Sequence, residues 1–210
     1  MIRTLLAAAL SLALATTSFA RTKDDAVVVT ADPIVFLQIG DEGDCTGFVT
    51  TAFDHKAIVT AGHCAEAAEG KQMTAKDSVG REFSVHAVYV DKVHDLSVFV
   101  PDAGVVAGPI AKTELACNAP VNVGDDITIT GYPTDFGKVT TFGKVAAMPS
   151  AWAAWPDVYR LNIFAAPGNS GSPVFNKAGQ VIAILVGGDP QFMGLSVAVP
   201  VAELCHPRIA

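Results

Sequence analysis

Three short stretches of the sequence carry residues that could together break an acyl bond. His63 closes one β-branched segment, Asp95 precedes another, and Ser170 lies in a loop with Gly168 and Gly171. A serine hydroxyl is a weak nucleophile at neutral pH, so it needs an imidazole base that a carboxylate holds in the right tautomer. The chain order His, Asp, Ser is one of the few known for this constellation. We therefore predict that His63 is the general base, Asp95 its orienting group and Ser170 the nucleophile.

The glycines around Ser170 indicate where a developing oxyanion would bind. A tetrahedral intermediate needs backbone N–H donors, and the loss of one donor typically costs about 3–4 kcal/mol. We predict that the N–H groups of Gly168 and Ser170 are these donors. Position 172 is a serine, so the second glycine of a G-x-S-x-G nucleophile elbow is missing, which argues against an α/β-hydrolase. Each motif alone has an ordinary structural explanation, such as a turn, and the prediction rests on their conjunction.

The rest of the chain is divided into short strand-like segments. They are rich in β-branched and aromatic residues, and Gly, Pro, Asn or Asp separates most of them. They cover residues 34–39, 46–51, 57–60, 83–90, 96–100, 127–132, 138–145, 158–164, 181–186 and 195–199. Helical periodicity is nearly absent, apart from a turn or two after Cys64 and a short helix over 201–205. Many short strands with few helices predict an all-β sandwich or barrel protein.

The strand-like segments fall into two groups. The first group covers residues 34–110 and the second covers residues 123–205. Residues 111–122 between them have the composition of a linker. This length fits one compact domain or two small fused ones, with room for a sizeable core.

Residues 1–20 have the composition of a signal peptide. Arg3 supplies a positive charge, an apolar run of Leu and Ala follows, and small residues precede a cut after Ala20. The alternative is a membrane anchor, but the apolar run is short for a bilayer. We expect a secreted or periplasmic protein without stable membrane association, and whether residues 21–33 form a removable propeptide stays open.

Charge and cysteine content limit which binding partners and which cellular compartment we expect for the protein. The sequence has 14 Lys+Arg, 21 Asp+Glu and no basic run, so nucleic acid is not an expected partner. All 4 cysteines follow the leader, and an even number in an oxidising compartment predicts two disulfides with three possible pairings. The cysteines form no C-x-x-C pair, so we expect no zinc site.

The three motifs together resemble those of the chymotrypsin-like, or trypsin-like, serine peptidases. The matching stretches are residues 60–64, 94–98 and 168–175, and residues 123–133 are similar to the opening of that family's second barrel. The similarity is strongest to the bacterial branch of glutamyl endopeptidases and HtrA-type peptidases. It implies an all-β fold of two six-stranded antiparallel β-barrels, with the active site in the cleft between them and a short C-terminal helix.

The same resemblance bears on the disulfides, the cofactors and the oligomeric state. It implies the pairs Cys45–Cys64 and Cys117–Cys205, and a mechanism that requires neither a metal nor an organic cofactor. We expect no PDZ domain after residue 205, and therefore a monomer rather than an HtrA-type regulated oligomer.

The resemblance also places a specificity pocket. By its alignment, Phe164 lies at the base of the pocket, where an aspartate would select Lys or Arg, and Ala165 follows it. Leu185 stands where the glutamyl branch has a histidine, and Gly187 and Gly188 leave the pocket side open. A Glu side chain would lose its hydration there without compensation. We expect a preference for small or medium apolar P1 residues; the alternative is that Phe164 fills the pocket and selectivity is weak.

One position departs from the trypsin-like pattern. Where those members have an aspartate that pairs with a newly cut N-terminal ammonium group, this sequence has the neutral Asn169. We expect activity without that ion pair. The predicted function is a secreted serine endopeptidase that hydrolyses peptide bonds of proteins or peptides through an acyl-enzyme. Two alternatives stay open, a protease-fold binding module with little catalysis and an esterase that uses the same triad.

Overall fold

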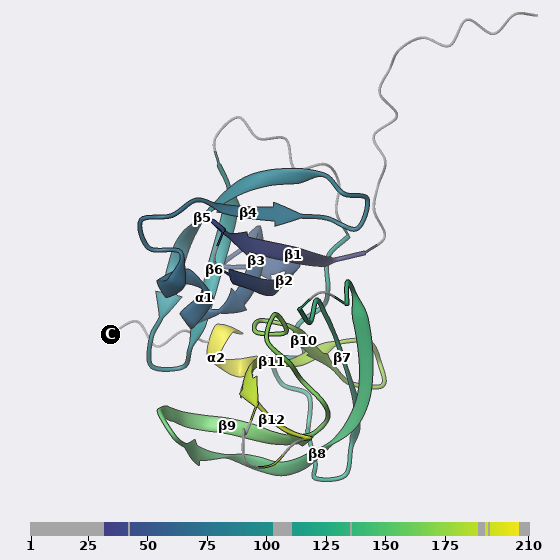
Figure 1. Cartoon of the computed structure of the whole chain (residues 1–210). Coiled ribbons are helices and arrows are strands. Elements are labelled where there is room, and N and C mark those ends of the chain that lie inside the picture. The colour runs from purple at the N-terminus through teal and green to yellow at the C-terminus, as the bar shows by residue number, and fades with distance from the viewer. Residues whose placement is uncertain are drawn as a thin grey trace, which may run out of the picture.

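Two closed β-barrels form the structure, which is a computed structural model (Figure 1). It describes residues 32–205 except 42, 103–110, 135, 189–191 and 193, so the predicted leader and most of the N-terminal segment lie outside the described residues. The strand orders are β1-β2-β3-β6-β5-β4 and β10-β11-β12-β9-β8-β7, and the paired strands are antiparallel. The predicted all-β fold of two six-stranded antiparallel barrels is therefore confirmed.

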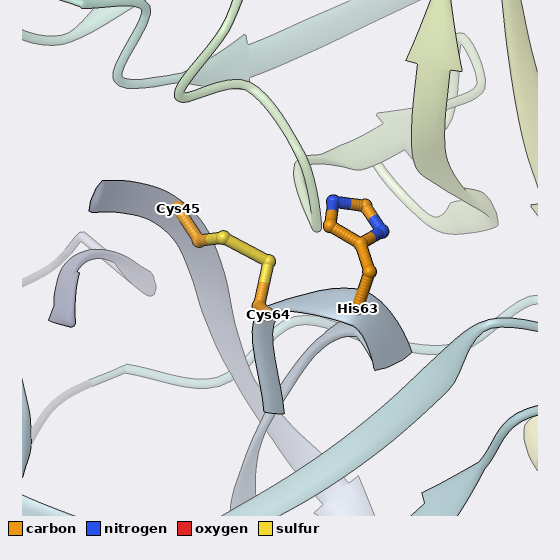
Figure 2. A group of neighbouring side chains, drawn as sticks. All are labelled: Cys45, His63 and Cys64. Carbon is orange, nitrogen blue, oxygen red and sulfur yellow. A yellow bond between two sulfur atoms is a disulfide. The ribbon is translucent and has the colours of Figure 1, made fainter. Parts of the chain in front are cut away.

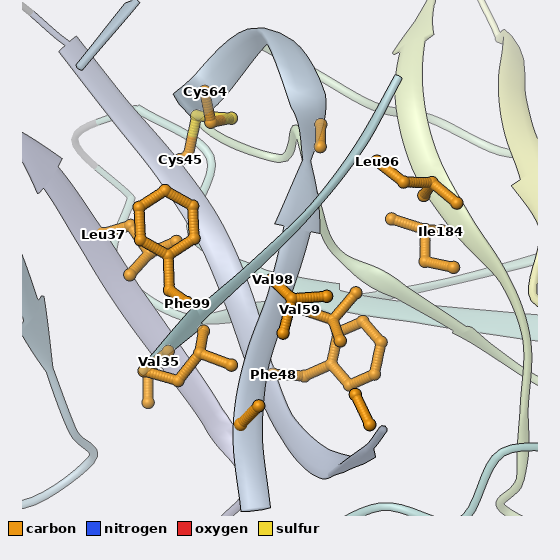
Figure 3. Packing of buried hydrophobic residues seen from close by; sticks show 14 of the residues in the cluster. Val35, Leu37, Cys45, Phe48, Val59, Cys64, Leu96, Val98, Phe99 and Ile184 are labelled. Carbon is orange, nitrogen blue, oxygen red and sulfur yellow. A yellow bond between two sulfur atoms is a disulfide. The ribbon is translucent and has the colours of Figure 1, made fainter. Parts of the chain in front are cut away.

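The first barrel surrounds an apolar core and carries one short helix on its rim. Its elements are β1 (Ile34–Ile39), β2 (Gly43–Ala52), β3 (His55–Ala61), α1 (Gly62–Ala67), β4 (Met73–Lys76), β5 (Glu82–Asp91) and β6 (Leu96–Pro101). Strands alternate side chains between their two faces, so one face of each strand points inward. Phe48 and Phe99 are among the largest fully buried side chains of this core (Figure 3).

The second barrel has a separate core and one unusually long hairpin. Its elements are β7 (Asp126–Gly131), β8 (Val139–Trp152), β9 (Trp155–Asn162), β10 (Pro173–Phe175), β11 (Val181–Gly188), β12 (Leu195–Pro200) and the terminal helix α2 (Ala202–Cys205). Ile129, Leu161 and Val174 are fully or almost fully buried in its core. The hairpin of β8 and β9 continues beyond the barrel wall, with several shifts of register along it.

Apolar contacts and the connecting segment join the two barrels. Ile184 of β11 belongs to the same buried cluster as Leu96 of β6 (Figure 3). In the segment predicted as a linker, the Thr113 N–H donates to the Val49 carbonyl at 2.8 Å. Two residues later, Leu115 pairs with Val181 of the second barrel. The segment therefore bonds to both barrels instead of crossing between them through solvent.

Two disulfides cross-link the described part of the chain, one across 19 positions and the other across 88. One joins Cys45 of β2 to Cys64 of α1, and the other joins Cys117 of the connecting segment to Cys205 of α2. These are the pairs that the family resemblance implied. Such bonds are typical of oxidising compartments. None of the described helices has the length and apolar character to cross a membrane.

Candidate active site

His63 and Asp95 are joined through both the backbone and the side chain of the histidine. The His63 backbone N–H donates to Asp95 Oδ1 at 2.6 Å, and His63 Nδ1 lies 2.9 Å from Oδ2 and 3.1 Å from Oδ1. An ionised carboxylate can only accept, so the ring hydrogen resides on Nδ1. That tautomer leaves Nε2 as the basic nitrogen.

The backbone around this pair allows an unusually close approach. Strand β3 ends at Ala61, so His63 lies in the first turn of α1, which begins slightly earlier than the sequence predicted. A Cβ on Gly62 would lie only 2.9 Å from the carbonyl carbon of Asp95. Asp95 itself has φ 56°, a sparsely populated conformation for a residue with a side chain. The bonds to His63 compensate this strain and fix the turn before β6.

The environment of Asp95 keeps its carboxylate ionised. Burial alone would raise the pKa of this side chain, since the residue is only 8% exposed. Hydrogen bonds and charge from His63, together with a bond from the Trp155 indole, outweigh burial and lower the pKa of Asp95 below its ordinary value. The Trp155 Nε1–H donates to Asp95 Oδ2 at 3.1 Å. A carboxylate that stays ionised can stabilise an imidazolium formed on His63.

Thr46 of β2 clamps the loop that carries Ser170 to the first barrel. Its N–H donates to the Ser170 carbonyl and its hydroxyl donates to the Gly168 carbonyl, both at 2.8 Å. The same hydroxyl accepts the Tyr132 N–H at 2.8 Å. A Cβ on Gly171 would overlap the backbone of Thr46, so this glycine allows the close packing. Thr46 follows Cys45, whose disulfide partner Cys64 follows His63, and the clamp thereby ties the Ser170 loop to the histidine turn.

Two backbone donors on the Ser170 loop have no acceptor in the part of the chain that the structure describes. Among the described residues, neither the Gly168 N–H nor the Ser170 N–H donates a hydrogen bond. Gly168 has φ 88°, and a Cβ there would overlap the Tyr132 carbonyl, so the position requires glycine. No bond between the Ser170 hydroxyl and the His63 ring occurs among the described contacts. Such bonds are often long without substrate and tighten in the complex.

A pocket of about 470 Å³ opens beside Ser170. It is lined by Phe164, Ala165, Ala166, Pro167, Ser170, Leu185, Gly187, Gly188, Gly194 and Leu195. The structure thus brings together all five residues that the sequence assigned to a specificity pocket. Leu185 is 1% exposed and forms the wall toward the core, whereas Phe164 is 58% exposed. The Phe164 ring therefore lies on the open side of the pocket, not at the base that the alignment suggested, and does not fill it.

Asn169, which precedes Ser170, has a buried side chain without an ionic partner among the described residues. It is 3% exposed, and its Oδ1 atom accepts no hydrogen bond from a described residue. The hydroxyl of the fully buried Ser172 is also without a partner there. Both atoms face Gly131, where a Cβ would displace them. A charged aspartate at position 169 would meet uncompensated desolvation in these surroundings.

The cysteines beside His63 form a disulfide and are not metal ligands. Sulfur atoms of Cys45 and Cys64 and a ring nitrogen of His63 lie within 4.8 Å of one another (Figure 2). The two sulfurs are bonded to each other, so neither is a thiolate, the form that binds a transition metal. Their bond fixes the start of α1 against β2 and so helps to place the imidazole.

Sequence reasoning missed two residues of this site, Thr46 and Trp155. Each acts through a contact that is distant along the chain, and neither belongs to a motif. The proximity of Thr46 to Cys45 was the one available signal, since a cysteine predicted to staple the His63 loop must lie near the site. Nothing in the sequence around Trp155 connects it with Asp95.

Comparisons with known proteins agree with this geometry. Residues 45–184 match the family model described as a trypsin-like peptidase domain. The protein HhoA from Synechocystis sp. is 30% identical over 168 residues, which are 77% of this chain and 41% of that protein. A glutamyl endopeptidase from Staphylococcus aureus is 38% identical over 92 residues, 41% of this chain and 24% of that protein. The chain therefore spans less than half the length of these relatives.

Solved structures show the same fold at lower identity. The HtrA-type protease AlgW with a tripeptide has a TM-score of 0.70 and 22% identity, covering 84% of this chain and 58% of that chain. A serine endoprotease from Yersinia pestis has a TM-score of 0.67 and 21% identity, covering 82% and 60%. With the match of the family model over most of the described residues, the chain belongs to the family of trypsin-like peptidase domains.

Proposed function

We propose that the protein is a serine endopeptidase that cleaves proteins or peptides outside the cytoplasm. The observation that carries this proposal is the joined pair of His63 and Asp95 beside a glycine-rich serine loop with uncommitted N–H donors. A binding module would not need an imidazole fixed in the one tautomer that leaves Nε2 basic. The two disulfides support the location, because such bonds persist in oxidising compartments outside the cytoplasm.

The proposed reaction proceeds in two acyl-transfer steps. The Ser170 hydroxyl attacks the substrate carbonyl while His63 Nε2 takes its proton, and Asp95 stabilises the resulting imidazolium. The N–H groups of Gly168 and Ser170 donate to the oxyanion. The imidazolium then protonates the leaving amine and an acyl-enzyme remains. Water, deprotonated by His63, attacks the ester and releases the acid, and the proton returns to Ser170.

The pocket next to Ser170 supports an apolar P1 preference. Its described lining side chains carry no charge, and Leu185 and Leu195 present hydrocarbon to an entering side chain. A Lys, Arg or Glu side chain would lose water there without a charged partner among the described lining residues. Small and medium side chains such as Ala, Val, Leu and Met bury apolar surface in the same space.

An activity-based probe tests the proposal directly. A fluorophosphonate reacts only with an activated serine, so we expect the folded wild-type protein to be labelled at Ser170. Ser170→Ala should abolish labelling, whereas Ser172→Ala, which removes a fully buried hydroxyl two residues away, should retain it. A folded wild-type protein without label would favour a binding module. Parallel rates on amide and ester substrates of the same sequence separate a peptidase from an esterase.

A further inference from the structure

Trp155 stands at the tip of the long hairpin of the second barrel. It is the first residue of β9 and pairs with Trp152, the last residue of β8. The two rings are stacked, with centroids 5.5 Å apart and planes within 3° of parallel. Both rings also pack against the buried apolar cluster that contains residues of both barrels. The hairpin tip is thus a rigid aromatic element that reaches across the junction of the two barrels.

The indole completes the hydrogen bonding of the Asp95 carboxylate. Oδ2 accepts His63 Nδ1 at 2.9 Å and Trp155 Nε1 at 3.1 Å, while Oδ1 accepts the His63 backbone N–H at 2.6 Å. His63 and Asp95 both belong to the first barrel. Among the described residues, the indole is the one donor to this carboxylate that comes from the second barrel. It prevents the carboxylate from rotating away from the imidazole.

The other end of the same ring contacts the wall of the pocket. A Cβ on Gly187 would lie 3.4 Å from the Trp155 Cη2 atom, so the ring lies directly against this part of β11. Gly187 lines the pocket proposed to hold the P1 side chain. One indole therefore contacts both the carboxylate of the triad and the strand that binds substrate. A residue that only stabilised the fold would not need its polar atom at the carboxylate.

We propose that Trp155 is a positioning residue that holds Asp95, and through it His63, in register with the substrate-binding strand of the second barrel. An indole N–H donates and does not titrate, so this restraint persists across the working pH range. The inference rests on the proposed peptidase function. It adds a component that no motif of the sequence indicates.

Paired substitutions test the proposal. Trp155→Phe removes the donor and keeps an aromatic ring against Trp152 and Gly187, so we expect kcat to fall about 10- to 100-fold with KM changed less than about 2-fold. Trp152→Phe is the matched control, since no described hydrogen bond joins the Trp152 indole to Asp95. It should retain more than about half of kcat. Equal losses in both variants would mean that packing alone matters and would overturn the proposal.

A spectroscopic readout keeps the test independent of stability. The His63 Nδ1 proton, bonded to Asp95, should give a low-field NMR resonance in the wild-type protein. This resonance should move or broaden in Trp155→Phe and stay in place in Trp152→Phe. Should Trp155→Phe not fold, benzothienylalanine at position 155 replaces the N–H by sulfur in a ring of similar shape, and the same losses are expected. An unchanged resonance and kcat in either variant at position 155 would refute the proposal.

The two proposals fail in distinguishable ways. If the wild-type protein does not react with a fluorophosphonate, the peptidase function is wrong and the role of Trp155 in it falls as well. If the wild-type protein is labelled and turns over substrate while the variants at position 155 do so equally fast, only the role of Trp155 is wrong.

Discussion

The two halves of the candidate site differ in how completely the protein satisfies their polar groups. In the first barrel, both oxygens of Asp95 are occupied and His63 is held through its backbone and its ring. In the second barrel, the Ser170 loop has two backbone donors and the side-chain amide oxygen of Asn169 without partners among the described residues. One half is therefore preorganised by its own bonds, whereas the other leaves donors for a substrate to occupy. Preorganised donors that await a developing charge are the larger electrostatic contribution in many enzymes.

Removal of the nucleophile is expected to have the largest effect. Ser170→Ala should lower turnover by a factor of about 10⁵ to 10⁶ without unfolding the protein, because the general base then has no hydroxyl to activate. The measurement is steady-state cleavage of a peptide with an apolar P1 residue, together with circular dichroism. Near-normal turnover of Ser170→Ala would show that another group is the nucleophile.

Removal of the Asp95 charge from the preorganised half should lower turnover severely, but less than removal of the Ser170 hydroxyl. Asp95→Asn keeps the shape of the side chain and presents an amide donor to the imidazole, which stabilises the wrong tautomer of His63. Turnover should fall by about 10⁴. A loss below about 10-fold in Asp95→Asn would remove Asp95 from the triad.

Loss of the Thr46 hydroxyl, which clamps the Ser170 loop to the first barrel, should have the next largest effect on kcat. Thr46→Val removes the hydroxyl that donates to the Gly168 carbonyl and accepts the Tyr132 N–H. The Gly168 donor then loses its restraint, and we expect kcat to fall about 100-fold, close to the loss of one oxyanion donor. Unfolding free energy should fall by about 2 kcal/mol, because one buried and one partly buried backbone group lose their partner.

Thr46→Ser is the control for this clamp. It keeps the hydroxyl and loses only a methyl group, so it should restore most of kcat. A peptide aldehyde, whose adduct places an oxyanion in the same site, should bind Thr46→Val much more weakly and Thr46→Ser almost normally. If both variants bound it equally, Thr46 would not position the Gly168 loop.

The pocket should give a smaller and graded effect. Gly188 lines the pocket, and among the described residues a Cβ there would meet only the Leu195 carbonyl, at 3.7 Å, so a larger residue should fit but narrow the space. Gly188→Val should lower kcat/KM for Leu and Met at P1 by about 10-fold and that for Ala less, since a methylene changes discrimination by about 1–3 kcal/mol. A peptide-library profile of the wild-type protein dominated by Lys, Arg or Glu would contradict the apolar assignment.

Local signals predicted the all-β class and most of the strands, whereas the family resemblance supplied the two-barrel architecture, and the motifs supplied the candidates His63, Asp95 and Ser170. The β-branched runs located most strands, but β4 and β10 were missed because they are short and depend on pairing with neighbouring strands. Strand β8 extends well past the predicted end at residue 145, since pairing with β9 outweighs the weak strand preference of its second part. Tertiary context decided these segments.

Contacts between distant residues account for the part of the site that the sequence did not predict. The Thr46 hydroxyl reaches a carbonyl 122 positions later, and the Trp155 indole reaches a carboxylate 60 positions earlier. Neither residue type is unusual for a strand, so composition and periodicity contain no trace of these bonds. The sequence also did not predict that the Phe164 side chain lies on the exposed side of the pocket. An alignment gives the position of a residue along the chain and not the direction of its side chain.

The smallest effect concerns the dependence of stability on pH. The folded pKa of Asp95 lies below its ordinary value, because hydrogen bonds and charge outweigh burial. Such a group stabilises the fold above the pKa of an unfolded aspartate, about 3.9, and its contribution is lost as the pH falls through the folded pKa. Denaturant titrations of the wild-type protein and Asp95→Asn should therefore differ most near neutrality and converge in acid. Asp95 accepts hydrogen bonds from His63 of the first barrel and from the Trp155 indole of the second. If the difference in unfolding free energy between the two proteins stayed constant across this pH range, the charge of Asp95 would not contribute to holding the barrels together.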